Sequence, residues 1–163
     1  MNQDDTPSTG FYVPGQYRPD QSVGYLMKRV LSSVLAQADD RLASLDLTHA
    51  QWLPLFKLAA KECHTVAGLA RELELDPGAM TRSLDRLEAK GLVRRERSTE
   101  DRRVVNLVMT DEGRQVARQV PPVMAEVLNN HLQGFSEAEW KQLIALLTRM
   151  VANGDAMRQP PAE

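Results

Sequence analysis

Apolar residues along most of this chain recur every three or four positions, which is the period of an amphipathic helix. From residue 22 to about 44 this pattern holds over about six turns and predicts one long helix. A second helix is expected to begin after Thr48, because Thr48 and Gln51 have the spacing of a capping box. Leu47 and Trp52 stand at the two positions of a hydrophobic staple around the same helix start.

Two shorter helices are predicted between Thr65 and Gly91, with a tight turn between them. Thr65 suits the N-cap of the first helix. Asp76 can cap the second, and Pro77 suits its first position, where an amide donor would have no helical partner. Gly91 is expected to end the second helix, because glycine readily takes the left-handed conformation found there. The first helix carries its apolar residues at i, i+3, i+4 and i+7: Val66, Leu69, Ala70 and Leu73.

The second of these helices has two chemically different faces. Met80, Leu84 and Leu87 share a narrow apolar face at 100° per residue. Small residues at the start of the helix leave room for its N-terminus to approach the floor of a DNA groove, where Thr81 and two arginines can reach bases or phosphates. The face opposite the apolar one carries Gly78, Arg82, Asp85, Arg86, Ala89 and Lys90.

A basic β-hairpin is predicted directly after the second helix. Residues 92–97 and 104–109 have the pattern of two strands, and a polar loop over 98–103 with two arginines at its end joins them. Residues 82–103 contain eight basic and five acidic residues, a local net charge of +3, whereas the whole chain carries −2. The positive charge is therefore concentrated where a phosphate backbone would need it. Two short helices followed by such a hairpin predict a winged helix-turn-helix that binds duplex DNA.

Helical periodicity resumes at Thr110 and continues to Leu132, with a break or kink at the two prolines 121–122. A last helix is expected to begin where Ser136 and Glu139 repeat the spacing of a capping box. Its apolar stripe consists of Trp140, Leu143, Ile144, Leu147, Met150 and Val151.

The terminal helices are longer than a monomeric winged helix needs. They therefore predict a dimerisation layer whose apolar faces are buried between two chains. The expected fold is mainly α with a small β-hairpin wing, a winged helix-turn-helix joined to a helical dimerisation layer. The expected division is an N-terminal arm over 1–21, a helical dimerisation region over 22–46 and 111–153, a DNA-binding domain over 47–110 and a flexible C-terminus over 154–163.

The N-terminal arm contains three of the chain's eight aromatic residues. This is more than a disordered tail usually holds. We therefore expect the arm to dock on its own dimer or on the partner subunit. A flexible tail with incidental aromatic residues is the alternative.

Composition narrows the class of protein. The chain of 163 residues with 42% hydrophobic residues fits one domain with a core, and no apolar run is long enough to predict a transmembrane helix. The polar, acidic first residues argue against a secretory signal, and a single cysteine, Cys63, fits a reducing cytoplasm. Motifs of hydrolases, metalloproteases and nucleotide-binding loops are absent, so no enzyme activity and no cofactor is predicted.

Cys63 and His64 allow two further interpretations. A redox-sensing thiol would need a lowered pKa and a resolving partner, and the chain has no second cysteine. A zinc site would need three or four convergent ligands, whereas His49, Cys63, His64 and His131 are scattered along the chain. Neither a metal site nor a redox switch is favoured, and Cys63 is expected to be a small buried or loop-edge residue. Redox sensing through Cys63 stays open as a minor alternative.

At the two short helices and the hairpin the sequence resembles one known family. The segment L-E-L-D-P-G-A-M-T-R-S-L-D-R-L-E-A-K-G-L-V-R-R, followed by E-D-R-R-V-V-N-L-V-M-T-D-E-G, is similar to the MarR family of bacterial transcription regulators. In that family a D-x-R element lies at the wing tip, and here it corresponds to Asp101 through Arg103. Met109 stands where leucine is usual, which conserves volume. The resemblance covers essentially residues 22–152.

The resemblance implies a homodimer that binds an inverted-repeat operator in double-stranded DNA. It favours Arg103 as the arginine of the D-x-R element, with Asp101 orienting the loop, and it implies dimerisation through the N- and C-terminal helices. The wing arginines are expected in the adjacent minor groove or on its phosphates. The residues expected at the DNA are Pro77, Gly78, Ala79, Thr81, Arg82, Arg86, Arg94, Asp101, Arg102 and Arg103.

MarR-like regulators often sense small aromatic or phenolic acids between the dimerisation layer and the wing domain. The resemblance thus implies a repressor that a small effector, such as an aromatic carboxylate, releases from its operator. In this chain the first two helices would line the pocket, with an aromatic wall and a cationic or hydrogen-bonding partner for the carboxylate. Ordinary helix packing with solvated cations is the alternative for each residue. The candidate pocket residues are Tyr25, Lys28, Arg29, Ser32, His49 and Trp52.

Two other functions remain open at this stage. A ligand-independent or activating DNA-binding protein would share every feature of the DNA face. A protein-interaction module would use the same fold without nucleic acid and would tolerate neutral residues in place of the arginines.

Overall fold

The computed structural model describes residues 10–60, 65–98 and 104–158, and it confirms a mainly helical protein with one β-hairpin. The helices are α1 (Val23–Leu42), α2 (His49–Ala59), α3 (Val66–Glu72), α4 (Pro77–Ala89), α5 (Asp111–Ala117), α6 (Val120–His131) and α7 (Glu137–Arg158). The strands are β1 (Val93–Arg97) and β2 (Val105–Met109). Short 3-10 turns are η1 (Pro14–Gln16), η2 (Pro19–Gln21) and η3 (Ala43–Leu45).

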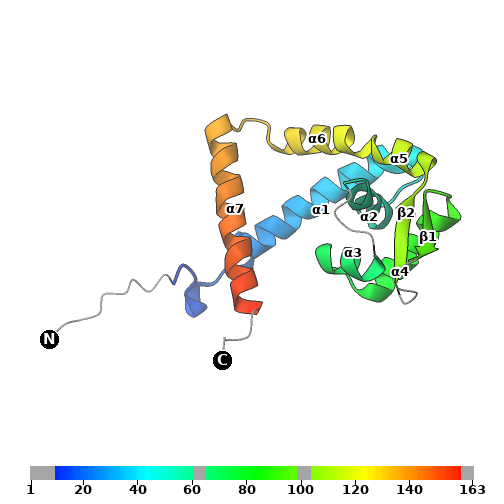
Figure 1. The fold of residues 1–163 in the computed structure, drawn as a ribbon. Coiled ribbons are helices and arrows are strands. Elements are labelled where there is room, and N and C mark those ends of the chain that lie inside the picture. The colour runs from blue at the N-terminus through cyan, green and yellow to red at the C-terminus, as the bar shows by residue number, and fades with distance from the viewer. Residues whose placement is uncertain (1–9, 61–64, 99–103, 159–163) are drawn as a thin grey trace, which may run out of the picture.

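The winged helix-turn-helix unit surrounds one hydrophobic core. Helices α2 to α5 and the hairpin gather on one side of the molecule, and one end of α1 runs into them (Figure 1). The two strands are antiparallel, with Val93 opposite Met109, and both residues point into the core. The predicted apolar face of α4 is confirmed, because Met80, Leu84 and Leu87 are at most 1% exposed. The core therefore fixes which face of α4 is left for solvent.

Local side chains start the two central helices as predicted. The Thr65 hydroxyl accepts a hydrogen bond from the amide of Gly68 at 3.0 Å. The Asp76 carboxylate accepts one from the amide of Ala79 at 2.9 Å, and Pro77 is the first residue of α4. Each cap satisfies an amide that the helix itself leaves without a partner.

The turn between α3 and α4 depends on a left-handed residue that is not glycine. Glu74 has φ of 50°, and its amide donates to the Arg71 carbonyl at 3.2 Å. The amide of Leu75 donates to the Ala70 carbonyl at 2.9 Å, which completes a Schellman ending for α3. Gly91, with φ of 69°, ends α4 in the same way, as predicted.

A second layer consists of α1, α6 and α7. Helix α6 lies along α1, and α7 contacts the winged unit only near its C-terminal end among the described residues (Figure 1). Three polar contacts among the described residues join α1 to α6: His131 Nε2 lies 3.0 Å from Ser33 Oγ and 3.4 Å from Gln37 Nε2, and the Arg41 guanidinium lies 3.3 Å from the Glu126 carboxylate. By contrast, no residue of α7 is buried. Helix α7 therefore presents its apolar stripe to solvent in the single chain.

Three helix boundaries differ from those expected. Helix α1 ends at Leu42, because a 3-10 turn replaces its last residues. The break after the hairpin falls at residues 118–119, and the prolines occupy the first turn of α6, where a missing amide removes no helical hydrogen bond.

The C-terminal end is helical further than expected. Helix α7 continues to Arg158 instead of ending at 153, so residues 154–158 of the expected flexible C-terminus are helical. Arg158 donates two hydrogen bonds to the Glu74 carboxylate, at 2.9 and 3.3 Å. These hydrogen bonds and the arginine charge lower the pKa of Glu74 below its ordinary value, so the carboxylate stays charged and the contact is lost as pH falls through that pKa.

The N-terminal arm folds locally against the start of α1. The Tyr12 hydroxyl accepts a hydrogen bond from the Val23 amide at 2.8 Å, and the rings of Tyr12 and Tyr17 meet edge to face with centroids 5.6 Å apart. Phe11 is 88% exposed. Docking of this arm on a dimer stays a prediction.

Candidate nucleic-acid interface

The first turn of α4 is narrow and lies at the molecular surface. Pro77 is exposed, and Gly78 and Ala79 are half-buried. The exposed Thr81 donates a hydrogen bond from its hydroxyl to the Pro77 carbonyl at 2.9 Å. The absence of large side chains here leaves the N-terminal end of α4 accessible to a groove.

Arg82 and Arg86 stand on the outward face of α4, opposite the core. Both are exposed, and neither has a partner among the residues that the structure describes. They are four positions apart and therefore lie one above the other on the helix surface. The two guanidinium groups are thus accessible, and their contact with bases or phosphates stays a prediction.

At the base of the wing, unlike on the outward face of α4, the arginines are paired with carboxylates. Arg95 pairs with the Asp85 and Glu88 carboxylates of α4, at 2.8 and 2.6 Å, so it fastens the hairpin to the helix. Arg94, expected at the DNA, is exposed and pairs with Glu96 at 2.7 Å. A phosphate would have to compete with that carboxylate for Arg94.

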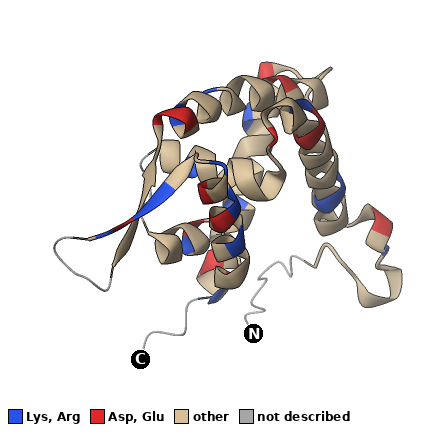
Figure 2. Cartoon of the chain, turned by 90° about the vertical axis from the view of Figure 1, so that its right-hand side faces the viewer, with Lys and Arg blue, Asp and Glu red and all other residues tan. Residues whose placement is uncertain are grey.

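The end of β1 leads toward the wing loop. Arg97 is exposed, and Figure 2 shows basic segments along the projecting hairpin. Arg97 is one of the eight basic residues of 82–103 and is not among the residues expected at the DNA, although its place at the end of the predicted strand points toward the wing loop. Asp101, Arg102 and Arg103 lie outside the described residues. The described part of the candidate interface is therefore the outward face of α4 with the outer end of β1.

Lys90 departs from its expected place. Helical periodicity puts it on the outward face of α4, yet its ammonium contacts the Asp46 carboxylate at 3.0 Å and the Gln51 side-chain oxygen at 3.3 Å. The side chain is 28% exposed. The reason is its position at the C-terminal end of α4, where a long side chain can reach back around the helix to the start of α2.

The arrangement of two short helices and a wing matches known regulators. A model of the MarR family matches residues 47–105 of the chain. The transcriptional regulator PA3341 shares 32% sequence identity, over 83% of this chain and 99% of that protein, with a TM-score of 0.75. The chain belongs to the MarR family. Its resemblance to that family is thus confirmed, and so is the winged helix-turn-helix fold.

Two further MarR-like structures bear on function. The Staphylococcus aureus MepR–DNA complex shares 25% identity, over 81% of this chain and 96% of that one, with a TM-score of 0.72. Bordetella bronchiseptica BpsR, whose DNA binding is regulated by 6-hydroxynicotinic acid, has the same fold, with 22% identity over 83% of this chain and 96% of that one, and a TM-score of 0.74. The chain is a DNA-binding transcriptional regulator with a fold that is not that of an enzyme family.

The candidate effector residues of this MarR-family chain fall into two groups. Tyr25, Lys28, Arg29 and Ser32 are exposed along the N-terminal half of α1. His49 and Trp52 lie on α2, with their rings in edge-to-face contact at 5.3 Å, and Trp52 is only 4% exposed. Buried atoms without a hydrogen-bond partner among the described residues include His49 Nδ1, Trp52 Nε1 and Asp39 Oδ1. No hydrogen bond, ion pair or ring contact among the described residues joins the α1 group to His49 or Trp52.

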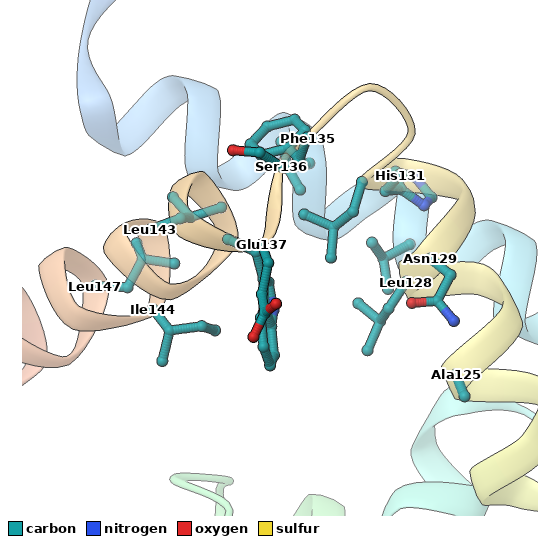
Figure 3. Close-up of a pocket in the computed structure, with 14 residues that line it drawn as sticks. Ala125, Leu128, Asn129, His131, Phe135, Ser136, Glu137, Leu143, Ile144 and Leu147 are labelled. Carbon is teal, nitrogen blue, oxygen red and sulfur yellow. The ribbon is translucent and has the colours of Figure 1, made fainter.

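A large apolar groove lies elsewhere, between α1, α6 and α7. Its volume is about 750 Å³, and Figure 3 shows side chains from α6 and α7 facing one another across it. Leu128, Phe135, Ile144 and Leu147 are among the residues that line it. Because its walls are the helices predicted for dimerisation, the groove is continuous with their exposed apolar stripes.

The remaining alternatives from the sequence are a zinc site and a redox-sensing cysteine. Cys63 and His64 lie outside the described residues. Among residues 10–60, 65–98 and 104–158, no group of three or more His, Cys, Asp or Glu residues could hold a metal ion. Within the same ranges no helix is long and apolar enough to cross a membrane.

Proposed function

We propose that this MarR-family protein is a homodimeric repressor that leaves its operator when a small molecule binds. The observation that carries the proposal is the outward face of α4, where Arg82 and Arg86 are exposed with no partner among the described residues, beside a basic hairpin. The DNA complex of MepR, a protein of the same fold, supports duplex DNA as the partner.

The proposed interface divides between base and backbone contacts. The first turn of α4 with Thr81 and Arg82 would enter the major groove, because small residues and a polar edge are needed there. Arg86 and Arg97 would contact phosphates, and the wing residues Arg102 and Arg103 would reach the neighbouring minor groove. Two copies would read half-sites about one helical turn apart, roughly 34 Å, on an inverted repeat.

The effector is proposed to be a small aromatic carboxylate. BpsR, a protein of the same fold, responds to 6-hydroxynicotinic acid, and α2 of this chain holds the buried polar edges of His49 and Trp52. An effector that binds best to a conformation with misplaced α4 helices shifts the protein away from DNA by linkage. To move the protein from 1:99 to 99:1 in favour of the conformation with misplaced α4 helices, the effector must bind that conformation more tightly by about 5.5 kcal/mol.

Neutralising the outward face of α4 is expected to weaken operator binding without unfolding the protein. The operator probe is a duplex selected by the wild-type protein from a random-sequence pool. Arg82→Ala is expected to cost about 1 to 3 kcal/mol and to relax specificity, because a base contact is lost. Arg86→Ala is expected to weaken binding to all duplexes and to lower the slope of log K against log salt by about 1.

Arg118→Ala is the matched control. This exposed arginine follows α5, and its guanidinium donates only to a main-chain carbonyl among the described residues. It should therefore retain wild-type affinity. If the Arg82/Arg86 double alanine variant bound the selected duplex like the wild type, the DNA face would be wrongly placed, and a protein-interaction module would become the better interpretation.

Aromatic acids are expected to stabilise the protein and to release DNA. At a concentration of 100 times the dissociation constant, a ligand that binds only the folded state adds about 2.7 kcal/mol to its stability. Benzoate, salicylate and 6-hydroxynicotinate can be compared with cyclohexanecarboxylate, which has the same charge without an aromatic ring. Melting temperature and release of the selected duplex are the two readouts. If none of the aromatic acids changes either, a ligand-independent regulator is the better description.

A further inference from the structure

Lys90 joins the recognition helix to a distant part of the chain. It caps the C-terminal end of α4, and its ammonium donates to the main-chain carbonyl of Asp46 as well as contacting the Asp46 carboxylate at 3.0 Å. The same ammonium lies 3.3 Å from the side-chain oxygen of Gln51. One charged group thus contacts three oxygens of residues 46–51, the segment that covers the α1–α2 junction and the first turn of α2.

That segment is itself tightly defined. Asp46 is left-handed, with φ of 53°, and it ends the 3-10 turn that follows α1. Gln51 is 4% exposed, and its side-chain oxygen also accepts a hydrogen bond from the Thr48 amide at 3.1 Å, which closes the capping box of α2. A change in the path from α1 to α2 therefore alters the positions of all three acceptors of Lys90.

A second contact holds the same two helices together. The hydroxyl of Ser83, which is 6% exposed, donates to the main-chain carbonyl of Ala50 in α2. Ser83 and Lys90 are seven residues apart, about two helical turns or 10.5 Å along α4. Because α4 is held at two separate points, its direction as well as its distance from α2 is set by the start of α2.

We propose that Lys90 is a positioning residue for DNA recognition, which acts by fixing α4 to the α1–α2 junction through Asp46 and Gln51. It is not one of the phosphate contacts suggested by its place in the basic stretch. In a dimer joined through α1, this bridge would help to set the separation and angle of the two recognition helices. The inference rests on the proposed operator binding.

If Lys90 is a phosphate contact or if it is a positioning residue, a change at its partner Asp46 should shift the affinity for DNA in opposite directions. Asp46→Asn removes a negative charge from a DNA-binding protein, so general electrostatics predicts equal or tighter binding. Loss of the bridge predicts weaker binding. Asparagine is the suitable replacement because it tolerates the left-handed conformation. Asp40→Asn is the matched control, since Asp40 is an exposed acidic residue of α1 with no partner among the described residues.

Affinity for the selected duplex would be measured over a range of salt concentrations, with circular dichroism as the test of folding. Lys90→Met is expected to weaken binding about tenfold, the scale of a lost charged hydrogen bond, while its salt slope stays at the wild-type value. Asp46→Asn is expected to weaken binding in the same direction by severalfold. The double variant should be no weaker than Lys90→Met alone, because both changes break one contact.

Three results would overturn the proposal. These are wild-type affinity for Lys90→Met, a salt slope lowered by about 1 in that variant, or binding by Asp46→Asn that is as tight as that of the wild type or tighter. If Lys90→Met failed to fold, Asp46→Asn compared with Asp40→Asn would still decide, because Asp46 is exposed and its side chain packs in no core. Failure of the wild-type protein to select any duplex would count against the proposed operator binding and would be seen before any variant is made.

Discussion

Replacing Gly113 by alanine is expected to lower the free energy of unfolding by about 3 kcal/mol, the largest stability effect foreseen for a single methyl group in this chain. A Cβ at this position would lie 2.0 Å from the main-chain oxygen of Leu92 and 2.9 Å from Met109 Cγ. The backbone of Leu92 cannot move away freely, because its carbonyl accepts the Thr110 amide at 3.1 Å. The Thr110 hydroxyl also donates to the Gly91 carbonyl at 2.6 Å.

Chemical denaturation at equal protein concentrations would measure the effect, since the stability of the proposed dimer would depend on concentration. Gly154→Ala is the control, because a Cβ there meets nothing within 4 Å and α7 continues through this residue. Alanine should raise helix stability at that site by up to about 1 kcal/mol. A cost of about 1 kcal/mol is the scale of mild overpacking. If the free energy of unfolding of Gly113→Ala lay within about 1 kcal/mol of the wild-type value, α5 would be able to move relative to the end of α4.

The helix ends were predictable from the sequence because each depends only on close neighbours. The caps at Thr65 and Asp76 need an amide three residues further along the chain, and Gly91 needs only the freedom of glycine. The same local logic correctly gave the capping boxes of α2 and α7 and the buried face of α4. Local rules missed Glu74, because a left-handed glutamate has no sequence signal like that of glycine.

Partners far away in the sequence could not be predicted. A helical wheel shows the direction in which Lys90 leaves α4, but not that Asp46, 44 residues earlier, lies within its reach. Arg95 is one of the eight basic residues of 82–103, and the net charge of that segment, which already includes Asp85 and Glu88, does not show that these two carboxylates pair with it. The net charge of a segment therefore overstates the charge available to DNA whenever acidic residues of a neighbouring element lie beside it.

The effector pocket shows a different limit. Helical spacing places Tyr25, Lys28 and Arg29 near one end of α1, but the single chain leaves them exposed and puts His49 and Trp52 on another element. Contacts that would form only between two chains do not show in the sequence or in the structure of a single chain. Their role as a pocket stays a proposal that depends on the dimer.

Introducing a charge on the apolar stripe of α7 is expected to separate the proposed dimer and to abolish tight operator binding. Helix α7 spans 22 residues without one buried side chain. Ile144 is 51% exposed, Val151 63%, and Val30 on α1 is 56% exposed. Exposed apolar stripes of this length require a second surface, and burial of each large side chain would contribute about 1.5 to 3 kcal/mol.

Ile144→Asp is the sharpest change, because Ile144 also lines the groove between α1, α6 and α7. Sedimentation velocity is expected to give a monomer at concentrations where the wild type is a dimer. Affinity for the selected inverted-repeat duplex should fall by at least about 100-fold, because two linked half-site contacts become independent. Gln142→Asp introduces the same carboxylate on the opposite face of α7 and should leave the dimer and its affinity unchanged.

The pair of variants separates assembly from recognition. Arg82→Ala should remain dimeric and lose affinity at the DNA surface, whereas Ile144→Asp should keep an intact α4 and lose the fixed spacing between two copies of it. On a duplex that carries a single half-site, the monomeric Ile144→Asp protein would bind as weakly as the wild type does, since the contacts with one half-site are unchanged. If Ile144→Asp stayed dimeric and kept its affinity, α7 would not form the dimer interface, and the exposed stripe would have to be covered by another partner.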